Sequence, residues 1–153
     1  MGEKPTKIIF VCHGNICRSP MAEFIFKQLV ESQGCAEDFE ISSAAVSYEE
    51  EGNGLYPYAA DTLRRHDIPF GGHRAHRITP QEYAGADLVV VMDSSNLRLL
   101  QRICPDTCKA HKLLEYAGQT SDVADPWYTG NFEQAFSDIL RGCRALLKHL
   151  NSH

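Results

Sequence analysis

The feature that most constrains the fold is a run of five apolar residues, Leu-Val-Val-Val-Met, at positions 88–92. A strand that is apolar on every residue must be covered on both faces, as in a parallel sheet between two layers of helices. Residues 7–11 and 39–44 read as two further strands, and residues 112–114 as a weaker fourth one. Helical patterns separate these segments, so the sequence predicts an α/β fold with a parallel sheet.

Apolar spacing and turn residues place the helices between these strands. One helix is expected after Pro20, which suits a first turn. A second is expected over residues 58–66, and a third ends before Pro105. Apolar side chains recur at helical spacing from 132 to 150 and predict a long amphipathic final helix.

Length and composition indicate one globular domain over residues 1–153, since 43% of the residues are apolar. Fifteen basic against 20 acidic residues give a net charge of -5, which argues against a nucleic-acid partner. No apolar run approaches the roughly 20 residues of a membrane helix. Six cysteines in 153 residues are too sparse for a disulfide framework, so we expect a reduced, cytoplasmic chain.

The loop after the first strand is where a parallel sheet of this kind binds ligands. Its sequence is Val-Cys-His-Gly-Asn-Ile-Cys-Arg-Ser-Pro, residues 11–20, and we call residues 12–19 the cysteine loop. The spacing between Cys12 and Arg18 lets successive backbone N–H groups converge on an oxyanion at a helix N-terminus. Gly14 supplies the backbone freedom for this curl, and Arg18 can donate to two oxygens at once.

Cys12 would lie beneath the central atom of such an anion. The same positive field favours its thiolate, which can attack a bound phosphorus atom in line. Ser19 could donate a hydrogen bond to that sulfur. The alternative is that Cys12 is a buried core cysteine and Arg18 a surface residue.

Asp125 is a second candidate for chemistry. A phenolate leaves far better when it is protonated, and help from a general acid is worth about 10²–10⁴-fold in rate. A carboxylate stiffened by Pro126 can reach over the phosphate, although an Asp-Pro pair can also simply start a turn.

Three stretches of the sequence resemble the motifs of a known family. Residues 11–20, the stretch Val-Met-Asp-Ser-Ser-Asn-Leu at 91–97, and Asp-Pro-Trp-Tyr at 125–128 look like the motifs of the low-molecular-weight protein tyrosine phosphatases. The similarity runs from residue 7 to about 148. It implies a four-stranded parallel sheet flanked by helices on both faces, and metal-independent hydrolysis of phosphotyrosine without a cofactor.

The resemblance also implies residue roles. Cys12 would form a phosphocysteine intermediate, Arg18 would bind phosphate and stabilise the transition state, and Asp125 would act as general acid and then base. The other loop residues expected around the phosphate are His13, Gly14, Asn15, Ile16, Cys17 and Ser19.

Further positions would support this site. Trp127 and Tyr128 would form one wall of the cleft, and Tyr48 the opposite wall. Asn15, together with Ser43 and His73, matches family positions that brace the cysteine loop. The resemblance makes Asp93 the residue that orients the arginine, and Cys17 a trap for an oxidised nucleophile or else a packing residue. We expect no metal, because Cys104, Cys108 and His111 have no fourth ligand at a suitable spacing.

The chain departs from the family pattern near the expected cleft. His13 replaces a usual leucine, and His76 stands where relatives often have arginine. Residues 31–60 hold seven acids and no lysine or arginine, with three of the acids at 49–51. That run is either a solvated loop or a feature that disfavours acidic residues around the phosphotyrosine and tolerates basic ones.

Three other functions compete with phosphotyrosine hydrolysis. Arsenate reduction on the same fold needs a relay of cysteines that this chain lacks beyond its third strand. Phosphoarginine hydrolysis goes with a threonine where this chain has Ile16, and a silent phosphotyrosine-binding module would lack the nucleophile or the acid. The expected partner is a phosphotyrosine protein, with a bacterial tyrosine kinase among the candidates, and inorganic phosphate or a similar oxyanion is expected in the loop.

Overall fold

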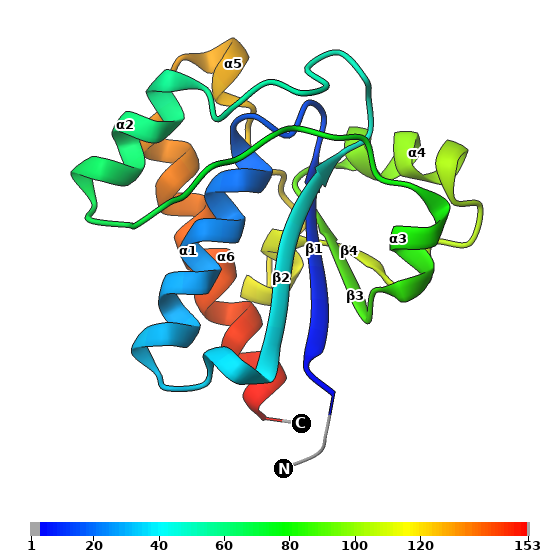
Figure 1. The fold of residues 1–153 in the computed structure, drawn as a ribbon, viewed down its shortest axis with the longest axis horizontal. Helices are drawn as coiled ribbons and strands as arrows, with labels where there is room; N and C mark the ends of the chain where they lie inside the picture. The colour runs from blue at the N-terminus through cyan, green and yellow to red at the C-terminus, as the bar shows by residue number, and fades with distance from the viewer. Residues whose placement is uncertain (1–3, 153) are drawn as a thin grey trace.

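The computed structural model describes residues 4–152; the predicted domain limits at 1 and 153 lie outside this range. Its sheet has four parallel strands in the order β2-β1-β3-β4, which confirms the predicted parallel sheet. The strands are β1 (Thr6–Cys12), β2 (Phe39–Ala45), β3 (Leu88–Val91) and β4 (Ala110–Lys112). Because the strands are parallel, their carboxyl ends lie at the same edge of the sheet, toward the upper part of the molecule in Figure 1.

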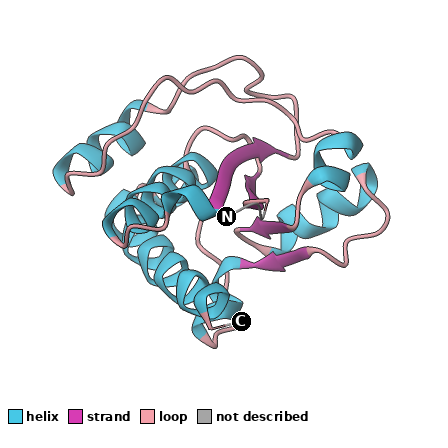
Figure 2. Ribbon diagram, turned by 60° about the horizontal axis from the view of Figure 1, so that its bottom comes forward, coloured by secondary structure: helices cyan, strands magenta, loops and turns pink. Residues whose placement is uncertain are grey.

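Helices cover both faces of the sheet, as Figures 1 and 2 show. One face carries α1 (Arg18–Ser32), α2 (Pro57–Arg65) and α6 (Phe132–Asn151). The other carries α3 (Pro80–Gly85) and α4 (Ser94–Ile103). The single turn α5 (Pro126–Thr129) lies next to α2 at the upper end in Figure 1. Two 3₁₀-helices complete the fold, η1 (Ala36–Asp38) and η2 (Leu113–Ala117).

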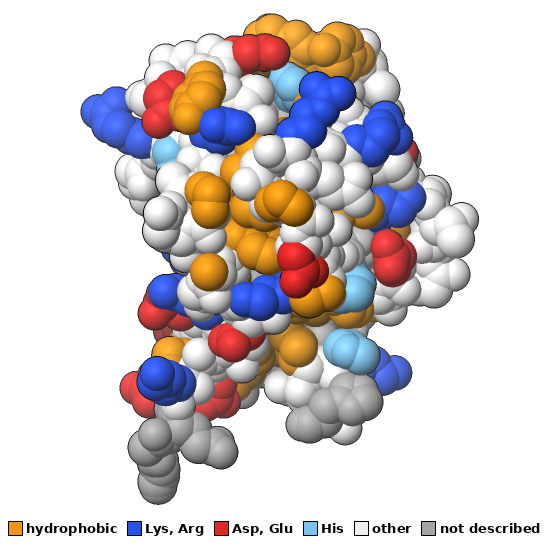
Figure 3. All heavy atoms as spheres, turned by 90° about the vertical axis from the view of Figure 1, so that its right-hand side faces the viewer, with side chains coloured by type: hydrophobic (Ala, Val, Ile, Leu, Met, Phe, Trp, Pro, Cys, Tyr) orange, Lys and Arg blue, Asp and Glu red, His pale blue; other side chains and the backbone are white. Residues whose placement is uncertain are grey.

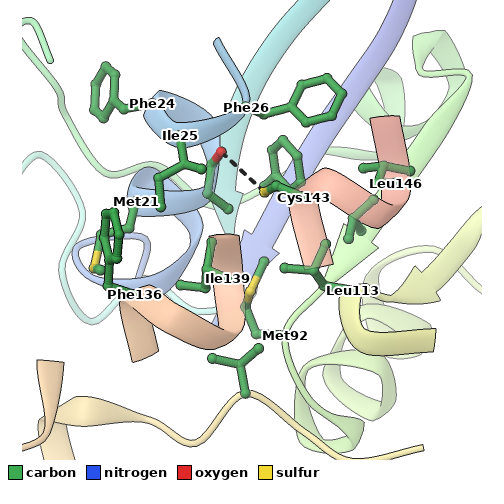
Figure 4. Close-up of a cluster of buried hydrophobic side chains, with 14 of the residues drawn as sticks. Met21, Phe24, Ile25, Phe26, Met92, Leu113, Phe136, Ile139, Cys143 and Leu146 are labelled. Carbon is green, nitrogen blue, oxygen red and sulfur yellow. Dashed lines mark hydrogen bonds between the residues drawn. The ribbon is translucent and has the colours of Figure 1, made fainter. Parts of the chain in front are cut away.

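Alternating residues of β1 explain the two helical layers. Ile8 and Phe10 are fully buried with α1 and α6, whereas Ile9 and Val11 point into the core beneath α3 and α4. Successive strand residues face opposite sides of a sheet, so an uninterrupted apolar strand needs both layers. In Figure 4 the first core brings apolar side chains of α1 and α6 together above Met92 at the end of β3.

Two details differ from the sequence prediction. The fourth strand ends at Lys112, and Leu113 and Leu114 belong to η2, where both are buried against the α6 side of the core. Their apolar character therefore reflects helix packing and not strand pairing. The helix α3 was not predicted, although Thr79 and Glu82 form a capping box that marks its start.

The strand order places a topological switch at the end of β1. The chain passes from β1 to β2 on one side and later enters β3 on the other side. The helices that follow β1 and β3 therefore lie on opposite faces and leave the carboxyl end of β1 open to ligands. The cysteine loop occupies that position.

Close packing between α6 and η2 generates the first testable prediction. Gly142 faces Leu113, and a Cβ added to it would lie 2.5 Å from Leu113 Cγ. We expect Gly142→Ala to lower the free energy of unfolding by about 1–2 kcal/mol, although alanine is the better helix former by about 1 kcal/mol. Urea unfolding measures this change. Ser137→Ala, at an exposed position of the same helix, is the matched control and should be neutral or slightly stabilising. A gain in stability for Gly142→Ala would contradict the packing.

Candidate active site

The cysteine loop joins the last residue of β1 to the first residue of α1 and surrounds the sulfur of Cys12 with hydrogen-bond donors. The backbone N–H groups of Asn15 and Ser19 each donate to Cys12 Sγ at 3.3 Å, and Ser19 Oγ lies 3.1 Å from it. No side chain caps the N-terminus of α1, where Cys17 is the N-cap residue. The first amides of the helix therefore remain available to an anion above the sulfur.

Asn15 gives the loop its shape. Its φ is 62°, in the left-handed region that asparagine tolerates better than most residues, and its side chain is fully buried. The Asn15 amide donates to Ser19 Oγ at 2.8 Å and to Ser43 Oγ on β2 at 3.0 Å. The ring of His73 contacts the Asn15 carbonyl at 2.7 Å, with Nε2 as the donor. These bonds fix the loop from its buried side.

The chain of hydrogen bonds continues to a residue that sequence reasoning missed. Ser43 donates to Glu23 Oε1 at 2.6 Å, and the other carboxylate oxygen of Glu23 accepts from Lys27 at 2.6 Å. Glu23 is only 9% exposed. A charged residue between the apolar residues Ala22 and Phe24 of α1 was the signal that could have identified it.

Arg18 is held in place from two sides although it is only 2% exposed. Its Nη1 donates to Asp93 Oδ2 and to the Val123 carbonyl, both at 2.7 Å, and its Nη2 donates to Asp125 Oδ2 at 3.4 Å. Burial alone would lower the pKa of Arg18, but the negative charges of Cys12, Asp125 and Asp93 more than offset it and raise the pKa. The guanidinium therefore stays charged and oriented.

The Val123 carbonyl was not predicted, because a backbone acceptor leaves no signal in the sequence. Its own N–H donates to the carbonyl of Met92 at the end of β3, which anchors this segment to the sheet. Two residues later, Asp125 is the N-cap residue of α5 and accepts from the Trp127 N–H at 3.0 Å. One carboxylate oxygen is thus fixed by the helix turn, and the other faces Arg18.

A cleft opens above the sulfur of Cys12. The described residues that line it come from the cysteine loop, the segment after β2 and α5. They are Cys12, His13, Gly14, Ile16, Cys17, Arg18, Glu49, Glu50, Asp125, Trp127 and Tyr128. Trp127 also packs against the ring of Tyr56, with their centroids 5.0 Å apart, so it supports the wall as well as forming it.

The structure corrects the placement of Tyr48. Its side chain is 66% exposed and does not line the cleft; its ring lies against Arg77, whose guanidinium also donates to the Tyr48 hydroxyl at 2.8 Å. The neighbouring Glu49 and Glu50 occupy that side of the cleft. The cation–π contact with Arg77 holds the ring away from the expected position.

Cys17 shares the cleft with Cys12 but differs in its surroundings. Burial, reinforced by the negative charges of Cys12 and Asp125, raises the pKa of the Cys17 thiol well above its usual value. Cys17 is therefore a neutral thiol at physiological pH, whereas two backbone N–H donors and the Ser19 hydroxyl surround the sulfur of Cys12.

Other candidate features lie outside this cleft. Within residues 4–152, no three His, Cys, Asp or Glu side chains lie close enough together to hold a metal ion. All six cysteines are free, and Cys104 and Cys108 are not among the residues that line the cleft. Over the same residues, no helix is both long enough and apolar enough to cross a bilayer.

A sequence model described as "Low molecular weight phosphotyrosine protein phosphatase" matches residues 7–153. The chain belongs to this family. The human low molecular weight phosphotyrosine protein phosphatase is 40% identical, and the match covers 97% of this chain and 98% of the human one. The low molecular weight protein-tyrosine-phosphatase YfkJ of Bacillus subtilis is 37% identical, with 92% of each chain covered.

Solved structures of phosphatases also share the fold of this chain. The crystal structure of YfkJ from Bacillus subtilis has a TM-score of 0.95 and 34% identity, and covers 99% of this chain and 98% of YfkJ. A Drosophila arginine phosphatase shares the fold with a TM-score of 0.87 and 30% identity, over 95% and 98% of the two chains. The low-molecular-weight phosphatase fold therefore extends to a relative named for another phosphorylated residue.

The backbone of Asn15 allows a direct test of how the loop is held. Asn15→Gly removes the side-chain amide but keeps the freedom to adopt a positive φ, whereas Asn15→Ala loses both. We expect both variants to be less stable than the wild type, and Asn15→Ala to be about 1 kcal/mol less stable than Asn15→Gly. Urea unfolding of the three proteins measures this difference. Equal stability of the two variants would show that the left-handed conformation costs nothing here.

Proposed function

We propose that this protein hydrolyses phosphotyrosine in proteins through a phosphocysteine intermediate on Cys12. The observation that supports the proposal best is the set of donors around Cys12 Sγ at the base of a cleft. Arg18 at the start of α1 and Asp125 at the start of α5 face the same space. Together these groups provide a nucleophile, a phosphate-binding cation and an acid.

In the first step the Cys12 thiolate attacks phosphorus in line with the bond to the tyrosine oxygen. The S–P bond forms as the P–O bond breaks, and Asp125 donates its proton to the leaving phenolate. The loop amides and Arg18 bear the charge of the phosphoryl oxygens in the transition state. Nη1 of Arg18 stays with Asp93, and the phosphate takes the Nη2 donor that contacts Asp125 at 3.4 Å.

In the second step water attacks the phosphocysteine. Asp125, now a carboxylate, accepts a proton from the water, and the S–P bond breaks to release inorganic phosphate. Ser19 Oγ lies 3.1 Å from the departing sulfur and can donate a hydrogen bond to the thiolate. No metal ion or cofactor enters either step. Cys17 lines the same cleft, and we propose that it traps Cys12 after a peroxide has oxidised the Cys12 sulfur to a sulfenic acid. The Cys17 thiol then displaces the sulfenic acid's hydroxyl as water and forms a Cys12–Cys17 disulfide.

The lining of the cleft favours an aryl phosphate over the two rivals on this fold. Ile16 is buried at the cleft wall, and Trp127 and Tyr128 offer exposed rings to a flat substrate. Arsenate reduction would require further cysteines within reach, but the described lining holds only Cys12 and Cys17. We propose that the physiological substrate is a phosphoprotein, with a bacterial tyrosine kinase among the candidates. We propose the cytoplasm as the location because the cysteines are sparse and free.

Phosphate release from a phosphotyrosine peptide tests the proposal. With reductant and excess EDTA, the wild type should release phosphate and Cys12→Ser should not. Folding of the variant is checked by urea unfolding. No release by folded wild-type protein would overturn the proposal, and arsenate reduction, phosphoarginine hydrolysis and silent phosphopeptide binding would then be assayed in that order.

The role of Asp125 predicts a dependence on the leaving group. Asn also caps helices well, so Asp125→Asn should keep α5 but lose the transferable proton. We expect its kcat to fall by about 10²–10⁴-fold on phosphotyrosine. The loss should be much smaller on an aryl phosphate whose phenol is strongly acidic, because that phenolate leaves without a proton. Equal losses on both substrates in steady-state assays would assign Asp125 a structural role only.

A further inference from the structure

The segment between β2 and α2, which we call the acidic loop (residues 46–56), packs directly on the cysteine loop. The Glu49 carboxylate lies 3.0 Å from His13 Nε2, and a Cβ built on Gly14 would lie 3.2 Å from Glu50 Cγ. The Val46 N–H also donates to the Cys12 carbonyl at 3.1 Å. These contacts place two carboxylates at the edge of the cleft that holds the nucleophile.

The charges around this cleft are unevenly distributed. Arg18 lies at the base and is only 2% exposed, whereas Glu49 is an exposed residue at the edge and Glu50 is half-buried. Asp125 adds a third carboxylate, and the described lining contains no lysine and no other arginine. The phosphate is thus met by buried positive charge, but substrate residues beside the phosphotyrosine meet negative charge.

The negative charge of Glu49 and Glu50 is confined to the edge of the cleft. Glu51, the third acid of the run, accepts a hydrogen bond from the Arg77 N–H at 3.1 Å and does not line the cleft. On the face that carries α3 and α4, lysine and arginine side chains gather toward the upper end of the molecule in Figure 3. Only residues close to the phosphotyrosine would therefore meet Glu49 and Glu50.

We infer that Glu49 and Glu50 make the enzyme select phosphotyrosines flanked by lysine or arginine and disfavour those flanked by aspartate or glutamate. The inference rests on the proposed function, because it concerns the same cleft. Charge complementarity of this kind acts on the encounter with the substrate and on its orientation. It should appear mainly in kcat/KM and be sensitive to salt.

A set of matched phosphopeptides tests the inference. The peptides differ only in carrying lysine, alanine or glutamate on both sides of the phosphotyrosine. At low ionic strength we expect kcat/KM to be about tenfold higher for the lysine peptide than for the glutamate peptide. The ratio should fall toward one near 1 M salt, where the screening length is about 3 Å. Moving the charged residues several positions away should also remove most of the difference.

Variants assign the effect to named residues. Glu49→Gln/Glu50→Gln removes both charges but keeps oxygen acceptors for His13 and for Asn53, which donates to Glu50 at 2.9 Å. The lysine-to-glutamate ratio should fall at least threefold in this variant. Glu51→Gln is the matched control, because its carboxylate lies outside the cleft, and the ratio should stay at the wild-type value.

Two outcomes would overturn the inference: equal kcat/KM for the three peptides with the wild type, or an unchanged ratio in the double variant. The salt series on the wild type needs no variant, so it tests the inference even if the double variant folds poorly. Free phosphotyrosine separates the two proposals. Turnover of free phosphotyrosine with no peptide preference contradicts only the inference, whereas no turnover of any substrate contradicts the proposed function.

Discussion

The side-chain amide of Asn15 links the cysteine loop to the neighbouring strand, and the rest of the site depends on that link. It donates to Ser19 on α1 and to Ser43 on β2, while the backbone of the same residue stands at a φ of 62°. Without these side-chain hydrogen bonds, nothing would hold the backbone N–H groups of residues 15 and 19 toward the sulfur of Cys12. Hydrogen bonds among fully buried groups are strong because water cannot compete for them.

The sheet supplies the frame for this loop. β1 is the inner strand at which the direction of chain progression reverses, so its carboxyl end lies open between the two helical layers. β3 brings Asp93 and, through the Met92 carbonyl, the Val123 segment to the same end. Val123 and Asp125, which lie more than 100 positions from Arg18 in the sequence, thereby contact its guanidinium.

The sheet and the oxyanion-binding loop could be predicted because each depends on residues that are close together in the sequence. The all-apolar run at 88–92 indicated the parallel sheet, and the spacing of Cys12 and Arg18 indicated an oxyanion site. The misplacement of Tyr48 has a different origin, since its ring is held by Arg77, 29 residues away, in a loop without periodicity. Glu23 and the Val123 carbonyl were missed because a buried ion and a backbone acceptor reveal their roles only through their partners.

In the proposed mechanism, the sulfur of Cys12 becomes covalently attached to phosphorus during turnover. We would denature Asp125→Asn protein rapidly during turnover of an aryl phosphate whose phenol is strongly acidic, because that leaving group needs no proton and only the second step is slowed. Mass spectrometry of its proteolytic peptides then locates the phosphoryl group. We expect one added phosphoryl group on the peptide that contains Cys12, and none in a sample that also carries Cys12→Ser. Phosphorylation at another residue, or steady turnover with no labelled Cys12 at any quench time, would contradict the proposed mechanism.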